Sequence, residues 1–262
     1  MHRKQALVTG ATGAIGAAIA QALANDLGFA VTLVGRDEAK TKRLAEEIRT
    51  NSGNPHVSYT LCDLSRRKEI TALAARWDKP LHVLINNAAQ TPRKRCETPE
   101  GIELQFATNV LGYVWMIDAF RDVLRRSAPA RVVNVASYWA GDLELDDLEF
   151  KRRPYSNNTA YRQSKQADRM LTAAYAERFK ADGVTVNCCH PGDVNSQLSN
   201  NLGFGGHESP SQGADTPVWL ATDPAGGQVT GKYFEHRRET HCRFAENRDA
   251  IEQLFSICHQ YQ

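Results

Sequence analysis

The sequence predicts an α/β protein with a doubly wound, Rossmann-like fold around a parallel sheet of about seven strands. Short apolar runs that resemble buried strands alternate with longer stretches of helical character. The strand-like runs are continuously apolar instead of alternating, which is typical of a parallel sheet covered by helices on both faces. A Gly-rich turn, residues 10–16, joins the first strand to the first helix. With no internal repeat and no linker, we expect one domain over residues 1–262.

Each expected strand is a short apolar run, and turn residues or helices separate one run from the next. The runs lie at residues 5–9, 30–34, 56–61, 83–85, 131–136, 184–189 and 232–234. The intervening stretches are long enough for crossover helices, as parallel pairing of the strands requires. They lie at residues 14–26, 38–49, 66–77, 101–126, 159–180 and 211–221, and apolar residues at helical spacing extend over the tail, residues 244–261.

Two segments without clear periodicity, residues 142–158 and 195–210, follow expected strands. Ligands of open α/β sheets bind beyond the carboxyl ends of the strands, and both segments begin at that edge. We therefore expect these two segments to form walls of a substrate pocket.

Composition excludes several classes of function. Hydrophobic residues make up 42% of the chain, charged residues 24%, and the net charge is +2, which gives no sign of nucleic-acid binding. No apolar run is long enough for a membrane span, and the first strand begins too early to leave room for a signal peptide. The six cysteines show no metal-ligand spacing, so we expect no metal site and a reducing, cytoplasmic location.

The Gly-rich turn predicts a dinucleotide site because it lies between a strand and a helix. Glycines let the backbone approach a pyrophosphate, and the helix N-terminus supplies N–H groups with a positive dipole. The cofactor-binding candidates in this turn are Gly10, Thr12, Gly13, Ala14 and Ile15.

The end of the second strand favours NADP(H), although NAD(H) stays possible. A carboxylate there suits the ribose 2′-hydroxyl of NAD, whereas an arginine suits a 2′-phosphate. Gly35 offers no carboxylate and Arg36 follows it directly. Asp37 is the competing feature, since it could bind the ribose or cap the next helix. Asp63, after the third strand, likewise could receive the adenine amino group or cap a helix.

Tyr161 and Lys165 form the strongest catalytic signal. They are four residues apart, so both side chains project from one face of a helix. An ammonium beside a phenol favours the phenolate and lowers a phenol pKa that starts near about 10. The pair is therefore expected to give and take protons near neutral pH, with Ser137 at the end of the fifth strand.

In order and spacing, these residues resemble the short-chain dehydrogenase/reductase family along nearly the whole chain. The resemblance includes the Gly-rich turn, Asp63-Leu64, Asn86-Asn87-Ala88-Ala89, Asn109, Ser137, Tyr161 with Lys165, and Pro191-Gly192. Ala14 and Ala89 stand where the common single-domain branch has glycine. The long stretch between Ser137 and Tyr161 is similar to that of retinol-dehydrogenase-like and WW-domain-oxidoreductase-like members.

The resemblance implies hydride transfer between a nicotinamide and a carbonyl or alcohol carbon. Tyr161 would be the acid/base, Lys165 would lower its pKa and hold the nicotinamide ribose, and Ser137 would bind the substrate oxygen. Asn109 would hold a water that relays protons to Lys165. The implied cofactor contacts beyond the Gly-rich turn are Arg36, Asp63, Leu64, Asn87, Ala88, Tyr161, Lys165, Pro191, Val194 and Ser196.

We therefore expect an NADP-dependent carbonyl reductase or alcohol dehydrogenase for a small apolar substrate. Tyr138 and Trp139 either wall the pocket or belong to the core. Two alternatives stay open: a sugar-nucleotide epimerase or dehydratase, suggested by the glycine spacing, and a non-catalytic NADP-binding sensor or scaffold. Because relatives often pair through two long helices, here residues 101–126 and 159–180, a homodimer or homotetramer is also expected.

Overall fold

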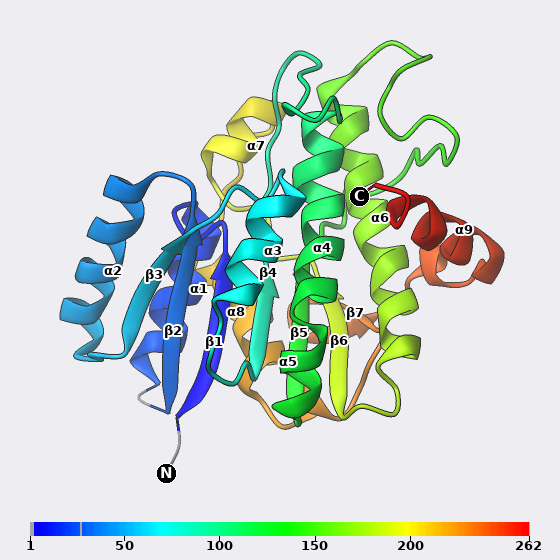
Figure 1. The fold of residues 1–262 in the computed structure, drawn as a ribbon. Coiled ribbons are helices and arrows are strands. Elements are labelled where there is room, and N and C mark those ends of the chain that lie inside the picture. Colours follow the sequence, from blue (N-terminus) through cyan, green and yellow to red (C-terminus); the bar gives the residue numbers. More distant parts are fainter. Residues whose placement is uncertain (1–2, 27, 262) are drawn as a thin grey trace.

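One central sheet of eight strands organises the part of the chain that the computed structural model describes, residues 3–26 and 28–261 (Figure 1). The strand order is β3-β2-β1-β4-β5-β6-β7-β8, and all neighbours pair in parallel except β8, which pairs antiparallel with β7. The strands are β1 (Lys4–Thr9), β2 (Phe29–Gly35), β3 (Val57–Leu61), β4 (Val83–Asn86), β5 (Ala130–Val135), β6 (Val184–Cys189), β7 (Tyr233–Glu235) and β8 (Arg238–Thr240). The expected doubly wound α/β fold is confirmed.

The strand order reverses between β1 and β4. The connection after β1 leads to β2 on one side, and the connection after β4 leads to β5 on the other side. Val8 of β1 pairs with Leu33 of β2 on one side and with Ile85 of β4 on the other. All three side chains are completely buried, as expected for central strands covered on both faces. A reversal of this kind leaves a crevice beyond the carboxyl ends of β1 and β4.

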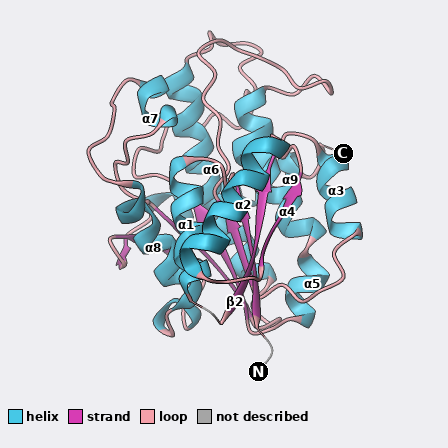
Figure 2. Ribbon diagram, turned by 90° about the vertical axis from the view of Figure 1, so that its left-hand side faces the viewer, coloured by secondary structure: helices cyan, strands magenta, loops and turns pink. Residues whose placement is uncertain are grey.

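Helices cover both faces of the sheet, as the view along its edge shows (Figure 2). On one face, α1, α2 and α8 bury Ile19, Ile48 and Leu220 against the strands. On the other, α3 to α6 and α9 form a second apolar core. The helices are α1 (Ala14–Asn25), α2 (Glu38–Ser52), α3 (Arg67–Ala75), α4 (Gly112–Ala119), α5 (Arg121–Arg126), α6 (Asn157–Arg178), α7 (Gln197–Leu202), α8 (Pro210–Thr222) and α9 (Arg248–Cys258), with the single turns η2 (Ala225–Gly227) and η3 (Arg243–Ala245).

The long helix expected over residues 101–126 is wrong as a single element. The structure instead has a π-helical segment, η1 (Phe106–Leu111), followed by α4 and α5, with a break at Phe120. The widened turn places Asn109 in its middle, and a π-helical segment inside a helix frequently marks a functional site.

Two short elements also differ from the expectation. The short strand β8 follows β7 through a tight turn, in which His236 and Arg237 have positive φ angles. The helix α7 lies inside the segment expected to be irregular, residues 195–210. Six residues are too few for an apolar periodicity, and a capping box between Ser196 and Ser199 defines this helix instead.

The C-terminal helix α9 packs along α6, as Figure 1 shows at the end of the chain. Its apolar face buries Ile251, Leu254 and Cys258, so the tail docks on the body of the protein. The backbone carbonyl of Tyr261 accepts a hydrogen bond of 3.3 Å from the indole N–H of Trp115 in α4. The tail is thus fixed to two neighbouring helices.

Truncating Leu254 to Ala is expected to lower the free energy of unfolding by about 2–5 kcal/mol, because this side chain is completely buried and its loss leaves a cavity. Urea denaturation measures the change. Gln253→Ala is the control, since the neighbouring side chain is exposed and its loss should alter stability by less than about 0.5 kcal/mol. Equal stability of the two variants would show that α9 does not contribute to the cooperative core.

Among the described residues, no helix has the length and apolar character that crossing a membrane requires.

Candidate active site

Two adjoining cavities lie at the carboxyl edge of the sheet and share the side chain of Tyr161. The larger, of about 550 Å³, runs from the Gly-rich turn past the end of β2 to Lys165. The smaller, of about 320 Å³, is bounded by the loop after β5, the loop after β6 and α7. Both cavities are also lined by Ile15, Pro191, Ser196 and Leu198. A long cleft that adjoins a compact pocket suits a dinucleotide and a small second ligand.

Most of the residues expected to bind the cofactor line the larger cavity. They are Gly10, Thr12, Gly13, Ala14, Ile15, Arg36, Asp63, Leu64, Asn87, Ala88, Tyr161, Lys165, Pro191 and Ser196. Val194 and Ser137 border the smaller cavity instead. Asn109 lines neither, although its neighbour Thr108 lines the larger one.

The Gly-rich turn is closely packed on its inner side, and this packing requires glycine at two positions. A Cβ atom on Gly10, which has φ of 60°, would lie 2.6 Å from the Ala88 Cα. A Cβ atom on Gly16 would lie 2.3 Å from the Gly10 carbonyl oxygen. The turn leads directly into α1, whose first N–H groups face the cleft without a side-chain cap. This geometry fits a pyrophosphate.

The end of β2 offers a cation and excludes a carboxylate. A Cβ atom on Gly35 would lie 2.2 Å from the hydroxyl of the buried Thr41, so an acidic side chain does not fit at that position. Arg36 is exposed and makes no hydrogen bond or ion pair with any described residue. The Asp37 carboxylate accepts the Lys40 backbone N–H at 3.0 Å and thereby caps α2. Of the two alternatives for Asp37, the structure shows the cap.

Two residues that were expected to contact the cofactor, Asp63 and Asn87, form hydrogen bonds within the protein. The Asp63 carboxylate accepts hydrogen bonds from the Ser65 backbone N–H at 3.0 Å and hydroxyl at 2.8 Å. The helix α3 is not capped by Asp63, because its N-cap residue is Arg66. The Asn87 amide group donates to the carbonyls of Thr9 at 3.0 Å and of Gly10 at 3.3 Å, which ties the end of β4 to the Gly-rich turn.

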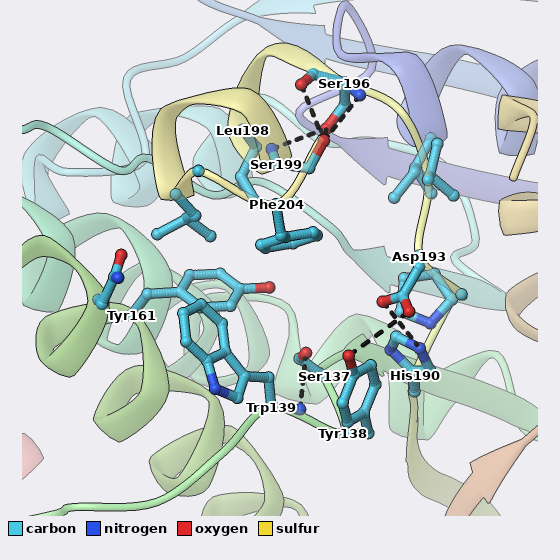
Figure 3. Close-up of a pocket in the computed structure, with 17 residues that line it drawn as sticks. Ser137, Tyr138, Trp139, Tyr161, His190, Asp193, Ser196, Leu198, Ser199 and Phe204 are labelled. Carbon is cyan, nitrogen blue, oxygen red and sulfur yellow. Dashed lines mark hydrogen bonds and ion pairs between the residues drawn. The ribbon is translucent and has the colours of Figure 1, made fainter. Parts of the chain in front are cut away.

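The hydroxyl of Tyr161 points into the smaller cavity, with Ser137 close by (Figure 3). The Ser137 hydroxyl accepts the Trp139 backbone N–H at 3.1 Å, so its own hydrogen stays available to donate. Both side chains are almost fully buried. Tyr161 belongs to helix α6, and Ser137 lies two residues beyond the end of β5, so its backbone is held close to the sheet.

Lys165 is completely buried beside a carboxylate that the sequence reading missed. Its ammonium donates to Asp168 at 2.9 Å and to the Val135 carbonyl at 3.0 Å. It also lies 5.9 Å from the centre of the Tyr161 ring. Since an ammonium has three N–H donors, two are engaged within the described residues and one is left for a ligand.

Burial dominates the acid–base properties of this cluster. It raises the pKa of Tyr161 above its ordinary value, while the Lys165 charge and hydrogen bonding to Ser137 act in the opposite direction. Lys165 thus has the expected effect, but it does not bring the net pKa of Tyr161 below the usual one. Burial also raises the pKa of Asp168 to about 6, against the lowering effect of Lys165, so the carboxylate is ionised at neutral pH.

Asn109 joins the loop after β4 to α6. Its side chain accepts the Gln90 backbone N–H at 2.8 Å and donates to the Gln90 carbonyl at 3.1 Å and to the Ser164 hydroxyl at 3.3 Å. No direct contact with Lys165 is among these bonds, so any proton path between the two side chains has to pass through another group.

Aromatic side chains wall the smaller cavity. Trp139 lies 6.1 Å from Tyr161 and 5.8 Å from Phe204, between ring centres, so three rings form a continuous apolar surface. Tyr138 and Trp139 both line the pocket, so they belong to its wall and not to the core.

The two segments expected to form pocket walls differ in their contribution. Within residues 195–210, α7 and the loop after it provide Ser196, Leu198, Ser199, Leu202 and Phe204. Within residues 142–158, only Asn158 among the described residues borders the cavity.

Most of segment 142–158 packs elsewhere. Glu149, for example, accepts a hydrogen bond of 2.8 Å from the hydroxyl of Tyr261. The expectation for this segment is therefore wrong for all but its end, because its apolar residues Leu148 and Phe150 are buried against the body and do not face the pocket.

Four further residues of the site escaped the sequence reading. Asp168 follows Lys165 by three residues on the same helix face, a spacing that predicts contact. Lys40 borders the larger cavity from the first turn of α2. His190 and Asp193 flank Pro191-Gly192 and line the smaller cavity, and only the fold brings them together.

Comparison with known proteins assigns the family. The family model for short chain dehydrogenases matches residues 4–204. Retinol dehydrogenase 13 of Homo sapiens is 33% identical over 252 residues, which cover 88% of this chain and 76% of that protein. A probable oxidoreductase of Streptomyces antibioticus is 34% identical over 257 residues, covering 90% of this chain and 86% of that protein.

A solved structure agrees with this assignment. The 3-oxoacyl (acyl-carrier-protein) reductase of Agrobacterium tumefaciens, crystallised with NADP bound, superposes with a TM-score of 0.71 at 26% identity. The match covers 89% of this chain and 93% of that one. The protein is therefore an oxidoreductase of the short-chain dehydrogenase family, within its retinol-dehydrogenase-like subgroup.

Proposed function

We propose that this enzyme uses NADP(H) to interconvert apolar carbonyl compounds and their alcohols, with Tyr161 as the acid/base. The observation that carries the proposal is the position of its phenol, which borders both the long cleft and the aromatic pocket. A group that serves both a cofactor and a substrate has to lie at such a junction.

The cleft residues support NADP(H) over NAD(H). Arg36 has no side-chain partner among the described residues, so its guanidinium is available to a 2′-phosphate. Lys40 also lines the cleft, and its ammonium lies 3.7 Å from the Asp37 carboxylate. Thr41 blocks the position where a ribose-binding carboxylate would stand. When bound, the nicotinamide supplies or accepts a hydride. The NADP bound in the reductase of Agrobacterium tumefaciens is consistent with this preference.

The protein supplies the proton chemistry. In the reducing direction Tyr161 donates its phenolic proton to the substrate oxygen, and in the oxidising direction its phenolate accepts one. Ser137 donates a hydrogen bond to the same oxygen and stabilises the charge that develops there. Lys165 stabilises the phenolate electrostatically, as its lowering effect on the Tyr161 pKa indicates. For Asn109, the water relay to Lys165 stays a prediction.

Turnover of apolar ketones and aldehydes tests the proposal. We expect purified protein to oxidise NADPH in the presence of small aromatic or alicyclic carbonyl compounds, which match the ring-lined pocket. Absorbance of the reduced cofactor measures the rate, and the reverse reaction is followed with the corresponding alcohols and NADP. NADPH binding without turnover of any carbonyl or alcohol would contradict the proposal.

Charge reversal at Arg36 is expected to weaken NADPH binding by about 10–100-fold, because Arg36→Glu sets a carboxylate against the 2′-phosphate. NADH binding should change little. Quenching of tryptophan fluorescence measures both affinities. Lys42→Glu is the matched control, since it reverses a charge on the neighbouring helix α2 at a position outside the cleft. An equal loss of affinity for NADPH and for NADH in Arg36→Glu would show that Arg36 does not distinguish the two cofactors.

The remaining expectations concern assembly and location. A homodimer or homotetramer through α4 and α6 stays a prediction, and it now has to leave room for α9 along α6. Gel filtration that elutes at the size of a monomer would contradict it. The cytoplasmic location likewise stays a prediction. The comparisons do not favour a sugar-nucleotide epimerase or a non-catalytic sensor.

A further inference from the structure

An acidic side chain faces the reacting phenol across the smaller cavity. Asp193 lies between Gly192 and Val194 in the loop after β6, and Figure 3 shows its carboxylate on the opposite side of the pocket from Tyr161. Its negative charge is among the influences that raise the pKa of Tyr161. The carboxylate therefore affects the site where the substrate oxygen reacts.

The backbone of Asp193 is held rigidly. Its carbonyl accepts the backbone N–H groups of His207 at 2.8 Å and Glu208 at 3.0 Å. Its own N–H donates to the Glu208 carboxylate. These bonds do not involve the Asp193 side chain, so a substitution of that side chain leaves the loop's anchoring in place.

Within the part of the chain that the structure describes, no lysine or arginine forms an ion pair with the Asp193 carboxylate. Its neighbours are the Tyr138 hydroxyl at 3.4 Å and the His190 ring nitrogen Nε2 at 3.9 Å. Burial lowers the pKa of His190 to about 3, helped by His236 and Arg169, so the ring is neutral at physiological pH. Throughout residues 3–26 and 28–261, neither Asp193 nor Glu208 forms an ion pair with a lysine or arginine.

Arg169, a buried cation whose charge acts on His190, is engaged by other groups. Arg169 donates to the Ser137 carbonyl and lies 3.5 Å from the centre of the Tyr233 ring. Asp193 itself keeps 30% of its side chain exposed, and it lines the cavity. A partly desolvated carboxylate without a counter-ion attracts a cationic group, and the surrounding aromatic faces of Tyr138, Trp139 and Phe204 favour the same kind of ligand.

We infer that Asp193 determines specificity by selecting carbonyl or alcohol substrates that carry a protonated amine on an aromatic or alicyclic body. The inference rests on the proposed function and narrows its substrate class from apolar compounds to amphipathic amines. The ring system lies against Trp139 and Phe204, the oxygen meets Tyr161 and Ser137, and the ammonium faces Asp193. Substrates with a carboxylate in place of the amine are disfavoured by repulsion.

A matched set of ketones tests this assignment. The set is acetophenone with an aminomethyl, an ethyl or a carboxylate group at the meta position of the ring, which changes the charge while keeping the size similar. We expect the aminomethyl ketone to exceed the ethyl ketone by about tenfold in kcat/KM and in affinity, and the carboxylate to be poorest. Quenching of tryptophan fluorescence gives the affinities independently of turnover.

The variant Asp193→Asn keeps the shape and removes the charge. The preference for the aminomethyl ketone should disappear, so that the ratio of its kcat/KM to that of the ethyl ketone falls to about one. Asp249→Asn makes the same change on the exposed surface of α9 and is the control. Asp193→Ser is a second neutral variant should the Asn variant fold poorly.

Two failures are distinguishable. Equal binding of the aminomethyl and ethyl ketones by the unmodified enzyme, or an unchanged preference in both neutral variants, would overturn the assignment of Asp193 and leave the proposed function standing. The enzyme can bind the aminomethyl ketone more tightly than the ethyl ketone and lose this difference in Asp193→Asn. That result supports the assignment of Asp193 even when no ketone is turned over. Absence of NADPH oxidation with every ketone would then contradict the proposed function alone.

Discussion

Tyr161→Phe is expected to lower kcat by about 10²–10⁴-fold, the usual contribution of a positioned acid or base. The phenol is buried at the junction of the two cavities, and only its oxygen is lost in the variant. The ring keeps its contact with Trp139, so the pocket should retain its shape. Steady-state kinetics and NADPH titration together measure the effect, and cofactor affinity should stay within about threefold because the phenol oxygen is one contact among many.

The control for this substitution is Tyr59→Phe. Tyr59 lies in β3, makes no hydrogen bond through its hydroxyl with the described residues, and borders neither cavity. Its loss should leave kcat unchanged. If Tyr161→Phe kept more than a tenth of the activity, another group would have to supply the proton.

Removing the carboxylate beside Lys165 is expected to destabilise the fold strongly. In Asp168→Ala the ammonium of Lys165 stays fully buried but loses its 2.9 Å partner. Breaking one side of a buried ion pair typically costs about 3–5 kcal/mol of unfolding free energy, because an uncompensated charge is left behind. Urea denaturation at neutral pH, where Asp168 is ionised, measures the loss.

A double substitution separates the charge effect from simple packing. Lys165→Met combined with Asp168→Ala removes both charges and differs from the single variant only at Lys165, where methionine has a similar volume, so it should recover part of the lost stability. The double variant is inactive by design and serves only the stability measurement. A double variant that stays as unstable as Asp168→Ala would show that the shape of this site, and not its charge balance, determines stability.

The fold could be predicted from the sequence because its main signals are local. Continuous apolar runs such as the one around Val8 indicate buried parallel strands, and the glycines of the turn after β1 mark a place where only a bare backbone fits. The π-helical segment around Asn109 was missed, since its extra residue per turn leaves no clear mark on an apolar stretch. Strand β8 was missed because its three residues are largely exposed.

The site could be predicted where its residues lie close in the chain or carry a recognisable pattern. Tyr161 and Lys165 meet on one helix face, and the same reasoning extends to Asp168. By contrast, Asp193 becomes part of the pocket only through the pairing of β6 beside β5, which sets the two loops side by side. The net effect of burial on the Tyr161 pKa was likewise beyond the sequence, because burial depends on everything packed around the phenol.

Because Gly35 contacts Thr41, the effect of a substitution at position 35 on cofactor preference depends on the residue at position 41. The Thr41 hydroxyl occupies the space that a side chain at position 35 needs, and it donates a 2.6 Å hydrogen bond to the Asp37 carbonyl. An acidic residue introduced at Gly35 alone would be overpacked, at about 1–3 kcal/mol. Replacing Thr41 alone by a smaller residue would add no contact with the cofactor. On the proposed preference for NADP(H), conversion to NAD therefore requires two changes together, of which the first is unfavourable alone and the second gives no advantage alone, and this is both a barrier to evolutionary drift and a rule for engineering the enzyme.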